Sequence, residues 1–583
     1  MTRIISYKIL IIGTFLFFAC SKNIEKVPLE LNTIEYIFDK DDSLGVYAER
    51  FLSGIYNTIP RGYNRVGSDL LDAARDLLDA ATDDAISSAT GSVDVYKLAT
   101  GGYNSSTFPS SENAWSKCYA GIRKANIFIN NIDIVPLNKI VEPGFLKKHA
   151  YKAEVRYIRA LLYFELLKRY GGVPLVEDNV WVLGDDVELP RNSFNECVNY
   201  IVRECDQIKD SLRTISQTKS VGEYHSITKG ACLALKTRVL LYAASPLFNG
   251  GNIEPDNELT GYTNYDINRW KLAENAAKEL MDRKEYELLP NLFSDVFITI
   301  DGIAGKINKE VILARLSSQN TNIEVSNAPV GFSPGTANGR TSPTQELVNA
   351  FPMKNGLDIN AAGSGYNVND PYNNRDPRLG MTIFYNGHKW LNTELETYEG
   401  GRSHPGNYNV ETRTSYYMRK FMGSFENTTN FSDVYHDFII FRYAEILLNY
   451  AESRNEFSGP DEQVYKVLKD IRNRAGIEAG PDNMYGLKSE MTKDEMRKTI
   501  QNERRIELAF EEHRYWDIRR WKTAETLSNI PLHGMSIIKG SSGRLIYSLN
   551  EVFTPVFIKK QYLYPIPYDE VVKNDNMVQN PGW

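Results

Sequence analysis

The chain has 583 residues, of which 42% are hydrophobic and 24% are charged, so it is long and apolar enough to fold around a large core. Its 67 Lys and Arg residues against 74 Asp and Glu residues give a net charge of −7, and no basic block is present, which argues against a nucleic-acid-binding protein. Beyond residue 20 no apolar run reaches roughly eighteen residues, so the pattern predicts no transmembrane helix in the body of the chain.

The amino-terminal segment has the pattern of a bacterial lipoprotein signal. Two basic residues precede an apolar run at 9–19, which has the length of a signal-peptide core and is too short to span a bilayer. A small residue stands directly before Cys20, as in a lipobox, where the cysteine is lipidated after cleavage. We therefore predict a signal peptide at 1–19, lipidation of Cys20 and a lipidated tether at 20–45. The alternative is an ordinary secretory signal.

Apolar residues recur at spacings of three and four along most of the remaining chain, which predicts a mainly α protein. Most of the predicted helices come in adjacent pairs. Several place a small residue beside a large aromatic one, such as Ala160 and Phe164, which is typical of tetratricopeptide-like helix pairs. The predicted helices cover residues 42–56, 69–84, 112–133, 143–170, 192–212, 228–244, 268–283, 437–456, 462–475 and 492–510.

Between about 285 and 435 the pattern changes to that of a loop-rich insert. Gly, Asn, Pro, Thr and Tyr crowd together there, which indicates loops and turns rather than packed helix. Short strand patterns interrupt the loops at 311–314 and 381–385. A loop region of this length inside a helical protein is usually functional.

The cysteines do not predict a disulfide framework. Only four occur besides Cys20, which is few for a chain of this length. Cys118 and Cys232 lie in apolar helical patterns and are expected to be small core residues. Cys197 and Cys205 lie about two turns, or about 12 Å, apart on one predicted helix, which is too far for a bridge between them.

The densest charged segment is 503–521. Glu503, Glu507 and Glu511 share one helical face, and five nearby arginines can pair with them. One interpretation makes Glu507 or Glu511 a catalytic acid or base. The other is a partly buried ion-pair network that holds the end of the helix. We favour the network, because the segment offers neither a nucleophile nor a set of metal ligands.

Other groups with possible chemistry are few. Asp83 and Asp84 are adjacent, and neighbours on a helix point about 100° apart, which does not suit a pair that flanks a glycosidic bond. We predict that they end a helix and bind locally, with a ligand contact as the alternative. The histidines are scattered, and the common metal, nucleophile and nucleotide motifs are absent from the sequence. We therefore predict no catalytic residue, metal site or cofactor, and leave a structural calcium ion open.

Several short sequence motifs are spread along the whole chain. Their order and spacing resemble those of the SusD/RagB family of outer-membrane nutrient-uptake lipoproteins of Bacteroidetes. One departure is the final residue, since the family often ends in tyrosine and this chain in tryptophan. Besides the lipobox, the motifs are Trp115 with Tyr119-Ala120-Gly121-Ile122, Glu154-Val155-Arg156, Tyr170-Gly171-Gly172-Val173-Pro174, Asp376-Pro377-Arg378, the segment 442–452, the block ERRIELAFE at 503–511, and Asn580-Pro581-Gly582-Trp583.

The resemblance implies a SusD-like fold, with tetratricopeptide-like helix pairs and an irregular, loop-rich ligand-binding face. It implies an N-terminal helical region at 46–250 and a C-terminal region at 251–583 that carries the insert at about 285–435. It also implies a lipid-anchored, surface-exposed protein of the cell outer membrane. Such a protein binds oligosaccharide or polysaccharide and delivers it to a SusC-like TonB-dependent barrel without cleaving it.

Ligand contacts are poorly shared within this family, so the resemblance points to regions, the loops at about 60–110 and 290–420. Sugar rings stack on aromatic faces, while Asn, Asp and Arg side chains bind the hydroxyls. On this basis the predicted ligand-binding residues are Tyr63, Asp83, Tyr103, Asn104, Phe332, Tyr372, Trp390 and Arg402.

Two alternative functions remain open at this point. The first is a peptide receptor of the RagB branch. The second is a surface glycoside hydrolase whose carboxylate pair comes from distant loops. The acidic net charge and the lack of an obvious Arg cluster in the loops favour a glycan over a peptide.

Overall fold

The computed structural model describes most of the chain after the predicted signal and tether. The predicted signal peptide and Cys20 lie outside the described residues, as does the tether up to residue 32. The described residues are 33–67, 75–91, 93–137, 140–142, 145–182, 184–185, 187–220, 226–289, 295–298, 308–332, 338–406 and 411–583.

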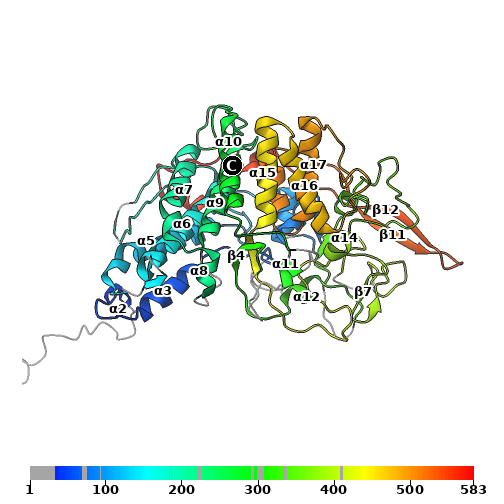
Figure 1. The fold of residues 1–583 in the computed structure, drawn as a ribbon, viewed down its shortest axis with the longest axis horizontal. Coiled ribbons are helices and arrows are strands. Elements are labelled where there is room, and N and C mark those ends of the chain that lie inside the picture. The colour runs from blue at the N-terminus through cyan, green and yellow to red at the C-terminus, as the bar shows by residue number, and fades with distance from the viewer. Residues whose placement is uncertain are drawn as a thin grey trace, which may run out of the picture.

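The first half of the chain is a row of packed helices, which Figure 1 shows in blue to green. Neighbouring helices along the chain contact one another, α5 with α6, α6 with α7, α7 with α9, and α9 with α10. These are the helix pairs expected from the sequence. The elements are α2 (Ile34–Ile37), α3 (Val46–Tyr56), α4 (Asp94–Thr100), α5 (Trp115–Asn131), α6 (Lys147–Tyr170), α7 (Phe194–Ile208), α8 (Ile215–Ser220), α9 (Lys229–Ala244) and α10 (Asn268–Asp282), with short 3₁₀ turns η1 (Leu78–Ala80), η2 (Ile132–Ile134) and η3 (Lys209–Ser211).

The second half continues this row and adds the loop-rich side of the molecule. Helix α15 packs on α9 and α10 from the first half and on α16 and α17 from its own half, so the helices form one continuous body (Figure 1). The elements are α11 (Asp295–Ile298), α12 (Asn322–Asn327), α13 (Gln345–Ala350), α14 (Pro377–Thr382), α15 (Tyr443–Ser458), α16 (Glu462–Ala475), α17 (Lys493–Glu507), α18 (His513–Arg520), η4 (Ala524–Leu527), η5 (Lys559–Tyr562) and α19 (Tyr568–Lys573).

Strands of the described residues form six antiparallel pairs, each of two strands. The long hairpin β11–β12 projects from the loop-rich end in Figure 1. The pair β4–β10 joins the insert to the residues just before α15. The pairs are β1 (Ala85–Ser87) with β5 (Thr341–Pro343), β2 (Ile140–Glu142) with β3 (Phe145–Leu146), β4 (Val311–Arg315) with β10 (Phe438–Arg442), β6 (Ile383–Phe384) with β9 (Tyr417–Met418), β7 (Lys389–Trp390) with β8 (Thr393–Glu394), and β11 (Leu532–Lys539) with β12 (Leu545–Phe553).

Local sequence signals explain where the main helices begin and end. Capping boxes begin α7 at Ser193 and α17 at Thr492. In each box, the hydroxyl of the capping residue accepts a hydrogen bond from the backbone N–H of the third helical residue, a glutamate. The carboxylate of that glutamate accepts one from the backbone N–H of the capping residue. Helix α6 ends at Gly171, whose φ is 76°. A Cβ at this position would lie 2.2 Å from the carbonyl oxygen of Leu259, so only glycine allows this close approach.

Three predicted elements differ from the structure. In the helix predicted at 69–84, the described residues 75–84 form turns and η1, because the carboxylates there bind distant partners instead of facing solvent. The helix predicted at 437–456 begins only at Tyr443, because its apolar first residues pair as β10 with β4. The strand predicted at 381–385 is reduced to β6, since α14 extends to Thr382.

Most of the core is one extended cluster that crosses from the first half to the second, and two small clusters lie where α9 meets α10. Cys118, Cys197, Cys205 and Cys232, the cysteines of the described residues, are all buried free thiols, in agreement with the expectation of no disulfide framework. No helix of the described residues combines the length and the apolar character that crossing a membrane requires.

Candidate functional site

The predicted residue Tyr372 belongs to a cluster of aromatic side chains on the loop-rich side. Its ring stacks on that of Tyr385 with centroids 4.3 Å apart and an angle of 18° between the planes. The ring of Tyr547, from the projecting hairpin, meets Tyr372 edge-on at 5.9 Å. The hydroxyl oxygens of Tyr372 and Tyr416 lie 3.1 Å apart. We call Tyr372, Tyr385, Tyr416 and Tyr547 the tyrosine cluster.

Four segments of the chain supply the tyrosine cluster, namely the loop before α14, the segment between β6 and β7, the residue before β9, and strand β12. Tyr416 is buried and anchors the cluster, whereas the other three rings are partly exposed. Burial and then the charge of the exposed Asp370 raise the pKa of Tyr547, which places that carboxylate near the cluster. Partly exposed aromatic rings can stack on a sugar ring, and a solvated carboxylate beside them can accept hydrogen bonds from the sugar hydroxyls.

Two other predicted residues, Phe332 and Arg402, lie on neighbouring loops. The hydroxyl of Ser403 donates to the carbonyl of Val330 at 3.0 Å, which joins the two loops next to these residues. The ring of Phe332 is half-buried against the core. The guanidinium of Arg402 is exposed and pairs with Glu396 at 3.1 Å. The structure therefore brings this predicted pair of residues close to each other, on the insert.

Of the predicted aromatic residues in the first loop region, Tyr63 is half-buried and Tyr103 is buried. Tyr63 lies against Phe421, with centroids 3.9 Å apart. Tyr103 is 7% exposed and stacks at 5.3 Å on Trp583, the carboxyl-terminal residue. The indole N–H of Trp583 donates a hydrogen bond to the carbonyl of Lys560 at 3.1 Å, which holds this tryptophan against η5. Asn104 is exposed, and its side chain accepts backbone N–H groups of its own turn.

Trp390 and Asp83 offer nothing to a ligand in this structure. Trp390 is 0% exposed, with Phe384 at 5.1 Å and Phe425 at 5.9 Å, so it is a core residue. The carboxylate of Asp83 is buried and accepts two hydrogen bonds from Arg514, at 2.8 and 2.7 Å. The local interpretation of Asp83 given above is the one that this geometry supports, since its contacts are with the protein itself.

The charged segment at 503–521 forms an ion-pair network, as predicted. Glu503, Glu507 and Glu511 are buried, whereas Arg505 and Arg514 are half-buried. Glu507 contacts Arg378 at 2.9 Å and Arg442 at 2.7 Å, and it also pairs with Arg474. Burial alone would raise the pKa of Glu507, but the three arginines outweigh it and hold this pKa well below its ordinary value. The group stays ionised and fixed, which suits a structural role and not proton transfer.

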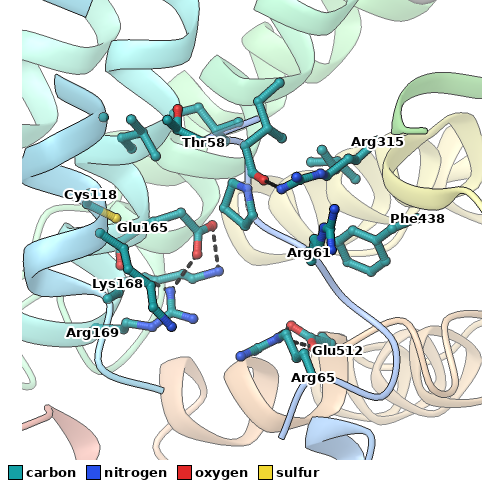
Figure 2. Close-up of a pocket in the computed structure, with 18 of the residues that line it drawn as sticks. Thr58, Arg61, Arg65, Cys118, Glu165, Lys168, Arg169, Arg315, Phe438 and Glu512 are labelled. Carbon is teal, nitrogen blue, oxygen red and sulfur yellow. Dashed lines mark hydrogen bonds and ion pairs between the residues drawn. The ribbon is translucent and has the colours of Figure 1, made fainter. Parts of the chain in front are cut away.

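A cavity of about 530 Å³ lies between the two halves of the molecule (Figure 2). Its walls are the segment 57–65, one face of α5 and α6, strand β10 and the turn that leads into α18. We call it the basic cavity, because nine Lys and Arg residues but only four Glu residues of the described chain line it. None of the predicted ligand-binding residues lines it.

Some charges of the basic cavity neutralise one another. Lys168 pairs with Glu165 at 2.8 Å, and burial lowers the pKa of Lys168 to about 8. Arg65 binds Glu512 through two hydrogen bonds, at 2.6 and 2.8 Å. Figure 2 shows these two groups at separate places on the wall, with the open space between them.

Comparisons with known proteins agree with this architecture. Residues 309–583 match the model of the SusD family, and residues 57–241 match a model described as starch-binding and associating with the outer membrane. The chain belongs to the SusD/RagB family. The two matched ranges share no residue and lie on either side of the junction between the two halves.

Relatives of this SusD-family chain are similar along most of its length. The SusD-like protein P38 of Formosa agariphila is 24% identical over 437 residues, which are 72% of this chain and 74% of the relative. A solved SusD-like protein of Bacteroides fragilis is 25% identical with a TM-score of 0.70, over 92% of this chain and 97% of its own. A SusD-like carbohydrate-binding protein of the same species is 22% identical with a TM-score of 0.70, over 91% and 98%. The mainly α, SusD-like fold is thereby confirmed.

Local sequence patterns hardly predict the basic cavity in this SusD-family protein. Its arginines come from segments far apart in the chain, so no local pattern announces them. One signal was available, because Lys117, Gly121 and Lys124 recur at spacings of four and three on α5 and thus share one face. Gly121 has a packing reason, since a Cβ there would lie 2.5 Å from Leu162.

Proposed function

We propose that this protein is a surface-exposed, lipid-anchored receptor of the outer membrane that binds a glycan. In this proposal it delivers oligosaccharide or polysaccharide to a SusC-like TonB-dependent barrel and does not cleave it. Membership of the SusD/RagB family supports the role, as do a family model described as starch-binding and a similar structure described as carbohydrate-binding.

The observation that carries the glycan-binding proposal is the tyrosine cluster. It lies on the loop-rich side, includes the predicted residue Tyr372, and presents three partly exposed rings from three separate segments. Tyr372 stacks on Tyr385 and meets Tyr547 edge-on, so these ring contacts order the cluster before a ligand arrives. Such preorganisation reduces the entropy lost on binding.

The carboxylates that had been considered as catalytic groups are buried in ion pairs, which also supports a binding role without catalysis. Glu503, Glu507 and Glu511 are buried, and each is paired with at least one Arg or Lys side chain. Asp84 is bound by Arg505 at 2.6 Å. A glycosidase needs one carboxyl group free to donate a proton and a second free to attack or to activate water. None of these four groups is free for that.

Calorimetry on the mature chain without its anchor, residues 21–583, tests the proposal against polysaccharides, their oligosaccharides and a mixed peptide pool. We expect saturable binding to a glycan and no turnover at any pH. Tyr385→Ala should lower the affinity about tenfold, about 1.4 kcal/mol, because a stacking face is lost. Tyr265→Ala is the matched control, since Tyr265 is 62% exposed and lies outside the cluster.

Two outcomes would contradict the proposal. Saturable binding to peptides alone would make the protein a peptide receptor of the RagB type. Release of reducing sugar from a bound polysaccharide would make it an enzyme. Delivery to a barrel is tested separately, by recovering a TonB-dependent transporter together with the protein from detergent-solubilised outer membranes of the native host.

A further inference from the structure

The glutamates of the basic cavity are all occupied by partners within the protein. Glu112 pairs with Arg65 and Arg169, and Glu165 pairs with Lys168 and Arg169. The other two are held in the same way, Glu511 by Arg442 and Lys420, and Glu512 by Arg65. These carboxylates therefore have little capacity left to neutralise further cations in the cavity.

Five cations of the cavity have no carboxylate partner among the described residues. Two of them, Lys117 and Lys124, are exposed on one face of α5, two turns apart. Arg315 donates one hydrogen bond, to the carbonyl of Ile59, which leaves most of its N–H groups for another acceptor. The five residues are Arg61, Arg75, Lys117, Lys124 and Arg315.

Arg61 and Arg315 stand close together on one wall. Figure 2 shows both side chains beside Phe438, across the cavity from Glu165 and Lys168. Burial, and then the positive charge of Arg61, lower the pKa of Arg315 to about 10. Two neighbouring guanidinium groups without a carboxylate repel each other, and an anion between them would remove that repulsion.

The same wall offers the other groups that a saccharide needs. Phe438 supplies an aromatic face next to the two arginines, and a Cβ on Gly62 would lie only 1.8 Å from its ring, so the backbone of the loop packs directly on it. Asn57, Thr58 and Asn113 add amide and hydroxyl groups to the lining. The volume of about 530 Å³ is within the range of small-ligand sites.

We propose that the basic cavity binds an acidic group of the glycan, a carboxylate or a sulfate ester, between Arg61 and Arg315, with Lys117 and Lys124 guiding the anionic chain along α5. The proposal rests on the glycan-binding function proposed above and narrows it to acidic glycans. The planar guanidinium group can donate paired hydrogen bonds to the oxygens of either a carboxylate or a sulfate ester, so the geometry suits both anions.

Calorimetry with two acidic ligands and their neutral counterparts tests this. The probes are oligogalacturonate and its carboxyl-reduced form, a sulfated galactan oligosaccharide and its desulfated form, and an acidic peptide pool. We expect at least one acidic glycan to bind at least tenfold more tightly than its neutral counterpart. We also expect that preference to shrink as NaCl rises, because salt screens exposed charges. The two pairs separate the carboxylate from the sulfate.

The variants assign the effect to the cavity. Arg61→Gln should lower the affinity for the acidic glycan at least tenfold without lowering the melting temperature, because it removes a repulsion and no internal ion pair. Arg544→Gln is the control, an exposed arginine in the turn of the β11–β12 hairpin. Equal affinity of Arg61→Gln and the unchanged protein for acidic glycans would overturn the inference.

Different binding results would contradict this inference and the proposed function. Binding of neutral glycans alone would overturn the inference and leave the receptor function standing. Binding of acidic peptides alone, lost in Arg61→Gln, would overturn both, because the anion would then belong to a peptide.

Discussion

Replacing Glu507 by alanine should lower the free energy of unfolding by about 3 kcal/mol. The side chain is 0% exposed, and its carboxylate is shared by Arg378, Arg442 and Arg474. Removing one partner of a buried ion pair costs about 3–5 kcal/mol, because the charge that remains has neither water nor a counter-ion.

The lower end of that range applies here because none of the three arginines is left alone. Each keeps at least one other carboxylate in contact, so the variant weakens the network without isolating a charge. The remaining partners are Asp376 for Arg378, Glu511 for Arg442, and Glu310 for Arg474.

Urea denaturation at neutral pH measures this effect. With a slope of about 3 kcal/mol per molar urea, a loss of about 3 kcal/mol lowers the midpoint by about 1 M. Asp494→Ala on the same helix is the control, because its side chain is 80% exposed and its pair with Arg497 is worth below about 1 kcal/mol. Glycan affinity should not change in Glu507→Ala.

The reasoning is refuted if Glu507→Ala and Asp494→Ala shift the midpoint by the same amount. It is also refuted if Glu507→Ala loses its ligand at an unchanged midpoint. The second result would return Glu507 to the role of a functional residue.

Three further predictions concern pH, backbone and anchor. Glu165, with a pKa lowered to about 2, and Glu503, Glu507 and Glu511, whose pKa values are also lowered, favour the folded state above the unfolded pKa of about 4.3. The urea midpoint should begin to fall below about pH 6.5, because burial lowers the pKa of His388 to about 4 and also lowers that of His513. It should fall more steeply below about pH 5, where the glutamates contribute, and an unchanged midpoint at pH 3 would contradict this. Gly171→Ala should lower the urea midpoint clearly, because it combines a φ of 76° with a clash against Leu259, whereas Gly543→Ala, at a φ of 81° in open space, should cost less. Cys20→Ala should move the protein out of the outer-membrane fraction or stop its processing, and continued fractionation with the membrane in cells without the partner barrel would refute lipidation.

Helix positions were predictable where the signals that set them are local. Helix α16 begins and ends at the predicted residues, because the side chain of Asp461 accepts two backbone N–H groups at its start and Gly476 adopts a left-handed conformation at its end. Both signals lie within the segment itself. The apolar run of β10 reads equally well as strand or helix, and its partner β4 lies more than a hundred residues earlier.

The candidate site was predictable by region but only partly by residue. An aromatic residue in a loop-rich segment has the same sequence signal whether it faces solvent or the core. Tyr372 ends in a partly exposed cluster, whereas Trp390 is enclosed by Phe384 and Phe425. The difference depends on which distant segment covers each ring, which no local pattern contains.

The sequence was least informative about the charge of the ligand. A net charge of −7 and the apparent lack of an arginine cluster in the loops favoured a glycan over a peptide, but they did not indicate whether the glycan is neutral or acidic. Net charge sums over the entire molecule, while a ligand responds to the charges within roughly one Debye length, about 8–10 Å. The fold places Arg61 beside Arg315, and neither has a carboxylate partner among the described residues, although the chain as a whole has more acidic than basic residues. A protein that repels anions at long range can therefore hold one tightly at this wall, and raising the salt concentration should weaken the contact while it reduces the repulsion from the rest of the surface.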